Sequence, residues 1–296
     1  MKKWLRRSAY VVGTLVALLV LTIGGIYGMS ASVLGARPEA AAHAIDPAAA
    51  NPTEGARLAL IFGCTDCHGT DFGGTMVIDE KPMARLAAPN LTAGRDGDAL
   101  TDEAFERAVR HGVGADGRSL IIMPSAEYTY LSDTDIANIL AYIRTMPPVQ
   151  RELPARSFGP VGRMLIATHK VQTQPALIAS DSNARHLTRP APDDTVQLGY
   201  YMTRICTGCH GHDLAGALPM DPSAPPGANL TPGGNPGHWS LEEFRTVFRT
   251  GRTPEGKQLN PAQMPWAMFG QANPEEIDAI WAYLQTLPAK ETAATK

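Results

Sequence analysis

The hydrophobic positions of this 296-residue chain form one long apolar stretch and, later, two sets of short amphipathic segments. The apolar stretch covers residues 9–27 and is long enough to cross a bilayer as a helix. Segments 132–146 and 273–287 each end before a proline and carry apolar residues at helical spacing on one face. Those residues are Ile136, Ile139, Leu140 and Ile143 in the first segment, and Ile277, Ile280, Trp281 and Leu284 in the second.

Capping signals predict a further helix ahead of each of these segments. Thr101 is followed by two acidic residues, and Gly112 closes the segment that it begins. Ser240 and Glu243 have the spacing of a capping box, and Gly251 ends that segment. No stretch alternates apolar and polar residues for long enough to predict a sheet. The pattern therefore predicts an all-α fold.

Four basic residues lie within the first seven, and no further charge appears until Arg37. The positive-inside rule then leaves the rest of the chain outside the cytoplasm. We expect a retained single-pass anchor with its membrane span at about 9–27. The alternative is a cleaved signal peptide with residues 30–32 as its cleavage site, although the apolar region of such a peptide is usually shorter, about 7–15 residues.

Comparison of the chain with itself indicates two copies of one domain of about 100 residues. The segment C-T-D-C-H-G at 64–69 recurs as C-T-G-C-H-G at 206–211. Asn-Leu-Thr at 90–92 recurs at 229–231, and the Met-Pro pairs at 123 and 264 also correspond. The expected organisation is an anchor and spacer over 1–45, a first domain over 46–147, a linker over 148–194, a second domain over 195–290 and a tail over 291–296.

Composition and charge narrow the classes of function. Hydrophobic residues make up 44% and charged residues 19%, which excludes a disordered chain. The net charge is −3 with no basic tract after the first seven residues, which predicts no nucleic-acid partner. Residues 46–150 hold 8 basic and 15 acidic residues, a net charge of −7, whereas residues 195–296 hold 7 and 9, a net charge of −2. Unless these carboxylates only solvate the surface, a basic partner should approach the first domain more readily, attracted by Asp102, Glu103 and Glu106.

The Cys-x-x-Cys-His motif is the attachment signature of a c-type haem. One helical turn presents two thiols to the two vinyl groups of the porphyrin, and the adjacent imidazole is held under the iron. The residues concerned are Cys64, Cys67 and His68 in the first copy, and Cys206, Cys209 and His210 in the second. A zinc site would need a fourth ligand repeated in both copies, and a thioredoxin-like site would need a strand before the helix. The sequence therefore predicts two covalently bound haem c groups.

Methionine is the expected sixth ligand of each iron, as in the His/Met pair of cytochromes c. Met123 lies 55 residues after His68, and Met264 lies 54 residues after His210. Both methionines precede a proline, which stiffens the loop, and both come just before the final helix of their domain. We therefore expect Met123 and Met264 to be the axial partners of the two histidines.

Each ligating histidine also needs a partner for its other ring nitrogen, commonly a backbone carbonyl. Pro89 and Asn90 are the candidates in the first domain, and Ala228 and Asn229 take the same positions in the second. The alternative is that these segments are simple turns built around asparagine.

Together these motifs resemble the His/Met c-type cytochromes. More narrowly, they resemble the membrane-bound cytochrome subunits of bacterial periplasmic dehydrogenases, such as the alcohol and gluconate enzymes. Further matching segments are D-F-G-G at 71–74 and D-L-A-G at 213–216. Those subunits commonly carry three haem motifs, whereas this chain carries two. The anchor of this chain is also N-terminal. We therefore expect two tandem cytochrome c domains after a transmembrane helix in the bacterial cytoplasmic membrane, with both haem domains facing the periplasm.

A membrane-tethered dihaem electron carrier is the favoured function, because methionine on both irons would close each haem to substrates. It would accept electrons from a dehydrogenase or quinol-oxidising complex and pass them to a terminal oxidase or a soluble cytochrome, and would not be an enzyme by itself. A dihaem peroxidase is one alternative, and it would need an open or displaceable iron position. A fixed cytochrome subunit of an oxidase complex is the other.

Overall fold

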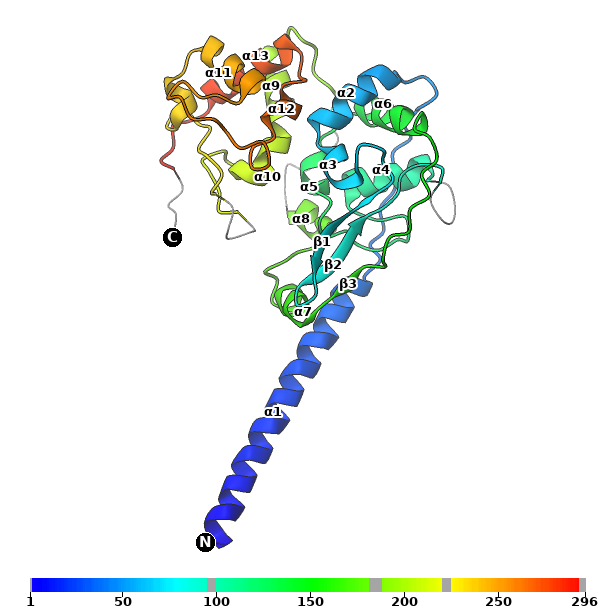
Figure 1. The fold of residues 1–296 in the computed structure, drawn as a ribbon, viewed down its shortest axis with the longest axis vertical. Helices are drawn as coiled ribbons and strands as arrows, with labels where there is room; N and C mark the ends of the chain where they lie inside the picture. Colours follow the sequence, from blue (N-terminus) through cyan, green and yellow to red (C-terminus); the bar gives the residue numbers. More distant parts are fainter. Residues whose placement is uncertain (1, 95–99, 181–187, 220–224, 293–296) are drawn as a thin grey trace.

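The computed structural model describes residues 2–94, 100–180, 188–219 and 225–292. One long helix, α1 (Lys2–Gly35), projects from two small helical lobes that lie side by side at its C-terminal end (Figure 1). The all-α class predicted from the sequence is confirmed as a mostly helical fold with this long apolar helix at its N-terminus. The side chains of its apolar stretch are exposed, and its length and mean hydropathy of 2.3 suffice to cross a membrane.

The two lobes repeat one order of helices. Lobe one contains α2 (Pro52–Ile61), α3 (Cys64–His68), α4 (Asp102–His111), α5 (Ser125–Tyr128) and α6 (Asp133–Arg144). Lobe two contains α9 (Thr195–Thr203), η1 (Arg204–Cys206), α10 (Thr207–His210), η2 (Asn235–His238), α11 (Leu241–Thr250), α12 (Trp266–Phe269) and α13 (Pro274–Thr286). The four helices predicted from capping and periodicity are α4, α6, α11 and α13.

The capping signals act as the sequence predicts. The Thr101 hydroxyl accepts a hydrogen bond from the Ala104 N–H at 3.1 Å, and Gly112 ends α4 with a φ of 65°. Ser240 and Glu243 form a complete capping box at the start of α11. Because these bonds satisfy backbone groups at the helix ends, short helices of ten residues can hold fixed positions in each lobe.

The core of each lobe is built where its first helix crosses its last helix. A Cβ atom placed on Gly55 of α2 would lie 1.9 Å from the Asn138 carbonyl oxygen of α6. A Cβ atom placed on Gly199 of α9 would lie 1.9 Å from the Ala279 carbonyl oxygen of α13. Glycine therefore lets the two helix backbones touch in both lobes. Around the crossings pack the buried residues Leu58, Phe105, Ile136 and Leu140 in lobe one, and Met202, Phe244, Ile277 and Leu284 in lobe two.

The expectation that the chain has no sheet was wrong for one small element of lobe one. β1 (Thr75–Glu80), β2 (Ala84–Ala88) and β3 (Ser157–Phe158) form an antiparallel sheet in the order β1-β2-β3. The strands are short, and β3 comes from the linker, 69 residues after β2 along the chain. A local alternation pattern could not reveal this pairing, because the partners meet only in the folded lobe.

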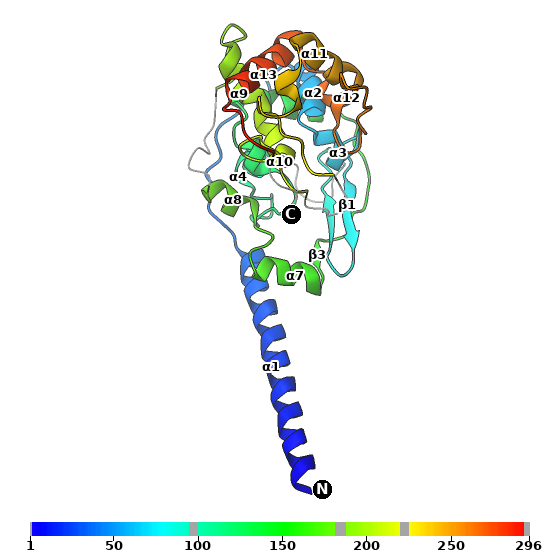
Figure 2. The same cartoon turned by 90° about the vertical axis from the view of Figure 1, so that its left-hand side faces the viewer.

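The linker between the lobes lies against lobe one and the end of α1. Its helices are α7 (Pro160–Ala167), which packs on α1, and α8 (Gln174–Ser180), which packs on α4 and α5. Figure 2 shows α7 lying across the C-terminal end of α1, beneath the lobes. The apolar piece 164–167 of the linker is the second half of α7. Residues 181–187 of the linker and 293–296 of the tail lie outside the described residues.

Candidate haem sites

The two Cys-x-x-Cys-His motifs form one tight helical turn in each lobe. In lobe one the turn is α3, which begins after Gly63 and ends at Gly69, both with positive φ. In lobe two it runs through η1 and α10 and ends at Gly211. Each turn carries two free cysteines three residues apart. This is the spacing that two thioether bonds to one porphyrin require.

The next feature is the acidity of the thiols, which burial weakens. Burial raises the pKa of Cys64 to about 12 and that of Cys206 to about 12. Reactive or metal-binding cysteines instead have a lowered pKa, because the thiolate is the active form. No group of three or more His, Cys, Asp or Glu side chains lies together as a metal site within the described ranges of the chain. The zinc and thioredoxin-like alternatives therefore gain no support.

Both histidines are buried and held by a backbone carbonyl. His68 Nδ1 lies 2.9 Å from the carbonyl oxygen of Pro89, and His210 Nδ1 lies 2.7 Å from that of Ala228. Burial lowers the pKa of both imidazoles, although the carbonyl contacts act in the opposite direction. A carbonyl only accepts, so Nδ1 carries the proton and the lone pair of the neutral ring is on Nε2. Each ring thus leaves Nε2 with a free lone pair, which is the form of histidine that binds a metal.

Two asparagines fix the loops that supply these carbonyls. The Asn90 side chain accepts a hydrogen bond from the Thr92 N–H at 2.9 Å and donates to the Val149 carbonyl at 2.7 Å. The Asn229 side chain accepts from the Thr231 N–H at 2.9 Å and donates to the Lys290 carbonyl at 2.8 Å. Neither amide contacts a histidine. Each one forms a turn and ties it to the segment after the last helix, and so sets the position of the preceding carbonyl.

The segments 71–74 and 213–216 follow the attachment turns and hydrogen-bond back to them. The Gly74 N–H donates to the His68 carbonyl and the Gly216 N–H to the His210 carbonyl, each at 2.9 Å. Phe72 and Leu214 are buried in left-handed conformations, with φ of 53° and 58°. A non-glycine residue rarely adopts this conformation. The same uncommon left-handed conformation therefore occurs four residues after each histidine.

The aspartates that begin these two segments hold the chain after the last helix. Asp71 pairs with Arg151 at 2.7 Å, and Asp213 pairs with Lys290 at 2.9 Å. The hydrogen bond from Arg151 lowers the pKa of Asp71, and that from Lys290 lowers the pKa of Asp213. Each lobe is therefore closed by an ion pair between its haem segment and its C-terminal extension.

The two methionines occupy matching positions in the two lobes. Met123 and Met264 are partly buried, and each lies directly before the proline that precedes α5 or α12. The Met123 carbonyl accepts a hydrogen bond from the Ser125 N–H at 2.8 Å, and the Met264 carbonyl accepts from the Trp266 N–H at 2.7 Å. The two loops therefore have the same local backbone. With thiols, an imidazole and a thioether, the donor set of each lobe fits haem c.

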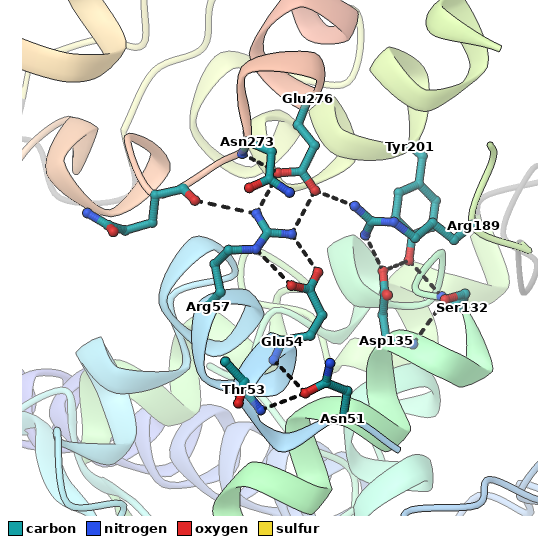
Figure 3. Close-up of polar contacts among 11 residues, drawn as sticks. Asn51, Thr53, Glu54, Arg57, Ser132, Asp135, Arg189, Tyr201, Asn273 and Glu276 are labelled. Carbon is teal, nitrogen blue, oxygen red and sulfur yellow. Dashed lines mark hydrogen bonds and ion pairs between the residues drawn. The ribbon is translucent and has the colours of Figure 1, made fainter. Parts of the chain in front are cut away.

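A charged network joins the lobes, and it is reciprocal (Figure 3). Arg57 of α2 contacts Glu276 of α13 at 2.6 Å, while Tyr201 of α9 donates to Asp135 of α6 at 2.7 Å. Arg57 and Tyr201 stand two residues after the crossing glycines, and the two acids are both the third residue of the last helix. The contacts are thus related by an approximate two-fold axis. Arg189 of the linker bridges Asp135 and Glu276.

Glu276 of this network is ionised because cations surround it. Burial opposes the ionisation of Glu276, but hydrogen bonds from Arg57 and the Asn273 backbone bring its pKa below the ordinary value of 4.5. Burial also lowers the pKa of Arg189, but the nearby Asp135 and Glu276 raise it by more. A paired, charged cluster therefore lies between the lobes.

The same interface brings each attachment turn against the other lobe. α12 of lobe two packs on α2, and α5 of lobe one packs on η1. Gly63, next to Cys64, faces the Met268 side chain of lobe two. A Cβ atom placed on Gly63 would lie 3.8 Å from Met268 Cε. Gly208, between Cys206 and Cys209, faces the Glu127 carboxylate of lobe one, at 3.5 Å by the same measure. Both haem-attachment turns are therefore at the contact between the lobes.

Sequence reasoning missed the residues that set this arrangement. The crossing glycines could have been found by self-comparison, since they lie nine and seven residues before the first cysteine of each motif. Arg57 and Tyr201 could not have been found in this way, because they take equivalent positions in the two copies and are different residue types. Arg189 belongs to neither copy of the repeat.

Comparisons with known families agree with this geometry. Residues 200–288 match the family model of cytochrome c, and residues 50–143 match that of cytochrome c oxidase, cbb3-type, subunit III. Each lobe is a cytochrome c domain, and the chain is a c-type cytochrome with two such domains.

Its curated relatives are larger subunits of dehydrogenases. It is 27% identical to the fructose dehydrogenase cytochrome subunit of Gluconobacter japonicus, over 80% of this chain and 53% of that protein. It is 24% identical to the cytochrome c subunit of the quinone alcohol dehydrogenase of Gluconacetobacter polyoxogenes, over 79% of this chain and 55% of that protein. It is 26% identical to the cytochrome c subunit of gluconate 2-dehydrogenase of Pantoea cypripedii, over 81% of this chain and 60% of that protein. The predicted relationship to dehydrogenase cytochrome subunits is confirmed. The chain spans about half the length of the curated relatives it matches.

Proposed function

We propose that this protein is a membrane-anchored dihaem cytochrome c that passes electrons between its two haems, as an electron-transfer subunit of a periplasmic dehydrogenase. The observation that carries the proposal is the interface, where both attachment turns lie against the opposite lobe. Two redox groups attached on either side of one fixed contact form a route for single electrons. The names of the relatives supply the class of complex.

In this proposal each haem is attached through two thioethers and held between one histidine and one methionine. Cys64 and Cys67 attach the first haem, with His68 and Met123 on its iron. Cys206 and Cys209 attach the second, with His210 and Met264 on its iron. The carbonyls of Pro89 and Ala228 orient the histidines, and Asn90 and Asn229 hold those carbonyls in place. The haems supply the one-electron chemistry, and the chain sets their ligands and separation.

The proposal retains α1 as an anchor, with both lobes on the periplasmic side of the bacterial cytoplasmic membrane. Two arginines of the linker bind the end of this helix. The Arg163 guanidinium donates to the Ser30 hydroxyl at 3.2 Å, and that of Arg156 donates to the Leu34 carbonyl at 2.9 Å. Cleavage at residues 30–32, as a signal peptide would require, would remove the first of these contacts and cut the chain beside the second. These bonds therefore favour an uncleaved helix.

The electron donor is the catalytic subunit of a dehydrogenase or a quinol-oxidising complex, and the acceptor is a terminal oxidase or a soluble cytochrome. A dihaem peroxidase differs from this in one measurable way, because one of its irons must be open to substrate. The matched loops around Met123 and Met264 support two closed irons instead.

Purification of the full chain from membranes of its native host tests the proposal. We expect two haems per chain that stay bound after denaturation, low-spin spectra from both irons, and a dehydrogenase subunit that copurifies. A five-coordinate, high-spin haem in the resting protein would favour the peroxidase. Copurification with oxidase subunits alone would favour a fixed oxidase subunit.

A further inference from the structure

A hollow of about 480 Å³ lies where α1 meets lobe one and the linker. Four arginines line it, and they come from separate parts of the chain: Arg37, Arg118, Arg156 and Arg163. Its remaining wall includes the apolar side chains of Leu34 on α1 and Phe158 on β3. Figures 1 and 2 both show β3 and α7 at this junction. The hollow therefore combines positive charge with an apolar wall.

The positive charge of this hollow is largely uncompensated. Arg156 donates only to the backbone carbonyls of Ser119 and Leu34, and Arg163 donates to Ser30 and lies over the Tyr27 ring at 4.9 Å. In the part of the chain that the structure describes, no carboxylate pairs with Arg37, Arg156 or Arg163. Arg118 has one exposed acidic neighbour, Asp116, at 3.7 Å.

This charge contrasts with the rest of lobe one. Residues 46–150 carry a net charge of −7, and other arginines of the lobe, such as Arg85 and Arg144, are paired with aspartates. Burial lowers the pKa of Arg156, and the neighbouring Arg118 lowers it further, although Asp116 acts against this. A group of like charges held together in this way is stabilised by an anion that binds between them.

The position of the hollow along α1 selects the kind of anion. At a rise of 1.5 Å per residue, residues 9–27 span about 29 Å, close to the thickness of a bilayer's hydrocarbon core. Ser30 and Leu34 then lie about 5–10 Å beyond Tyr27, in the region of the lipid headgroups. Beside them, α7 exposes Val161 and Met164, three residues apart, with 38% and 43% of their surface accessible. Such a helix fits the membrane interface.

We propose that this hollow binds the phosphate headgroup of an anionic phospholipid from the outer leaflet. Guanidinium groups match the geometry of a phosphodiester, and Leu34 and Phe158 form the apolar wall beside it. The bound lipid neutralises the arginines and ties lobe one to the membrane surface. The inference rests on the retention of α1 under the proposed function.

Native mass spectrometry of the full-length holoprotein in a non-ionic detergent tests this inference. The intact mass first establishes whether residues 1–35 are present, so that loss of the anchor is distinguished from failure of the lipid site. Dioleoylphosphatidylglycerol is then titrated against dioleoylphosphatidylcholine, which has the same chains and a neutral headgroup. We expect one phosphatidylglycerol per chain to bind in preference to phosphatidylcholine.

The Arg37→Gln/Arg118→Gln variant should weaken this binding by about 25-fold, the effect of two arginine charges near a membrane surface. The hydrogen bonds that tie the linker to α1 and lobe one come from Arg156 and Arg163, which the variant keeps. The haem spectrum should therefore be unchanged. Arg118→Lys keeps the charge but loses the planar guanidinium, so it should bind more weakly than the wild type and more tightly than the double variant. The matched control, Arg107→Gln/Arg252→Gln, removes two arginines outside the hollow and should have no effect.

Three results would overturn the inference while leaving the anchor intact. They are equal binding of the two lipids, equal affinity in both double variants, and displacement of phosphatidylglycerol by 10 mM inorganic phosphate. The last result would make the hollow a site for soluble phosphate.

Discussion

Arg57 in lobe one and Glu276 in lobe two lie 2.6 Å apart, and Arg57 also contacts Glu54 of its own helix (Figure 3). The exposed fraction of the Glu276 side chain is 4%, so water contributes little to its solvation. Removing one member of a buried pair leaves the other charge without compensation. We therefore expect the pair to help hold the two lobes, and the two haems that we propose they carry, in a fixed relation.

Glu276→Gln should weaken the docking of the lobes by about 2 kcal/mol, because Arg57 and Arg189 both lose a charged partner. The rate of electron transfer between the haems, measured by flash photolysis, should fall, and the radius of gyration in solution should rise. Asp79→Asn is the matched control, because it breaks an exposed pair with Arg85 and should leave the docking unchanged. An unchanged transfer rate in Glu276→Gln would show that the interface does not depend on this pair.

Acid should open the interface. The pKa of Glu276 is lower in the folded protein than its ordinary value of 4.5, so its ionisation favours the docked state. That contribution to docking is complete above about pH 5. It is lost as the pH falls through the folded pKa, because protonation of Glu276 then breaks its ion pairs with Arg57 and Arg189. Small-angle scattering should record expansion as the pH falls below 4.5. Glu276→Gln should be expanded already at pH 7 and respond less to acid, and an identical response in both proteins would contradict this assignment.

The axial ligands can be tested one iron at a time. Met123→Ala and Met264→Ala should each remove about half of the near-infrared band between sulfur and ferric iron, while both haems stay covalently attached. Met76→Ala is the control, because Met76 lies on the exposed face of β1. A variant that keeps the full band would exclude that methionine as a ligand.

The crossing glycines should be intolerant of even one methyl group. Gly55→Ala and Gly199→Ala each place a Cβ 1.9 Å from a backbone oxygen of the facing helix, so the two helices must move apart. We expect a loss of about 3 kcal/mol in the free energy of unfolding of the affected lobe, at the upper end for overpacking. Thermal unfolding followed by the absorbance of the haem measures it. Gly25→Ala in α1, where no atom lies within 4 Å, should have no effect on either lobe.

A basic partner should approach lobe one first, but not through all the carboxylates that the sequence suggested. Glu106 is fully buried and pairs with Arg110 at 3.2 Å, so it is not a surface charge as expected. Glu80 and Glu103 lie on the surface and keep the lobe acidic. Neutralising these two should slow the association of a basic soluble cytochrome c more than neutralising Glu242 and Glu243 in lobe two. Stopped-flow rates at rising ionic strength measure the effect. A rate independent of salt would exclude steering.

Local sequence could predict the helices and the haem motifs because each depends on neighbouring residues. The caps at Thr101 and Ser240 act within one turn, and a Cys-x-x-Cys-His segment carries its functional residues within one turn. Self-comparison added the correspondence between Met123 and Met264 without any structure. The β-sheet was not predictable in this way, since β3 joins it from the linker.

The sequence by itself determined two cytochrome c domains, an apolar N-terminal helix and the residues that could hold two haems. These properties follow from short-range spacing and from repetition. Only the tertiary structure decided how the domains meet, because Arg57, Asp135, Arg189 and Glu276 lie far apart along the chain and form one network only after both lobes fold. The arginine-lined hollow has the same origin. A cluster of like charges costs free energy, and three distant segments form it only because the packing of α1, lobe one and the linker holds them together.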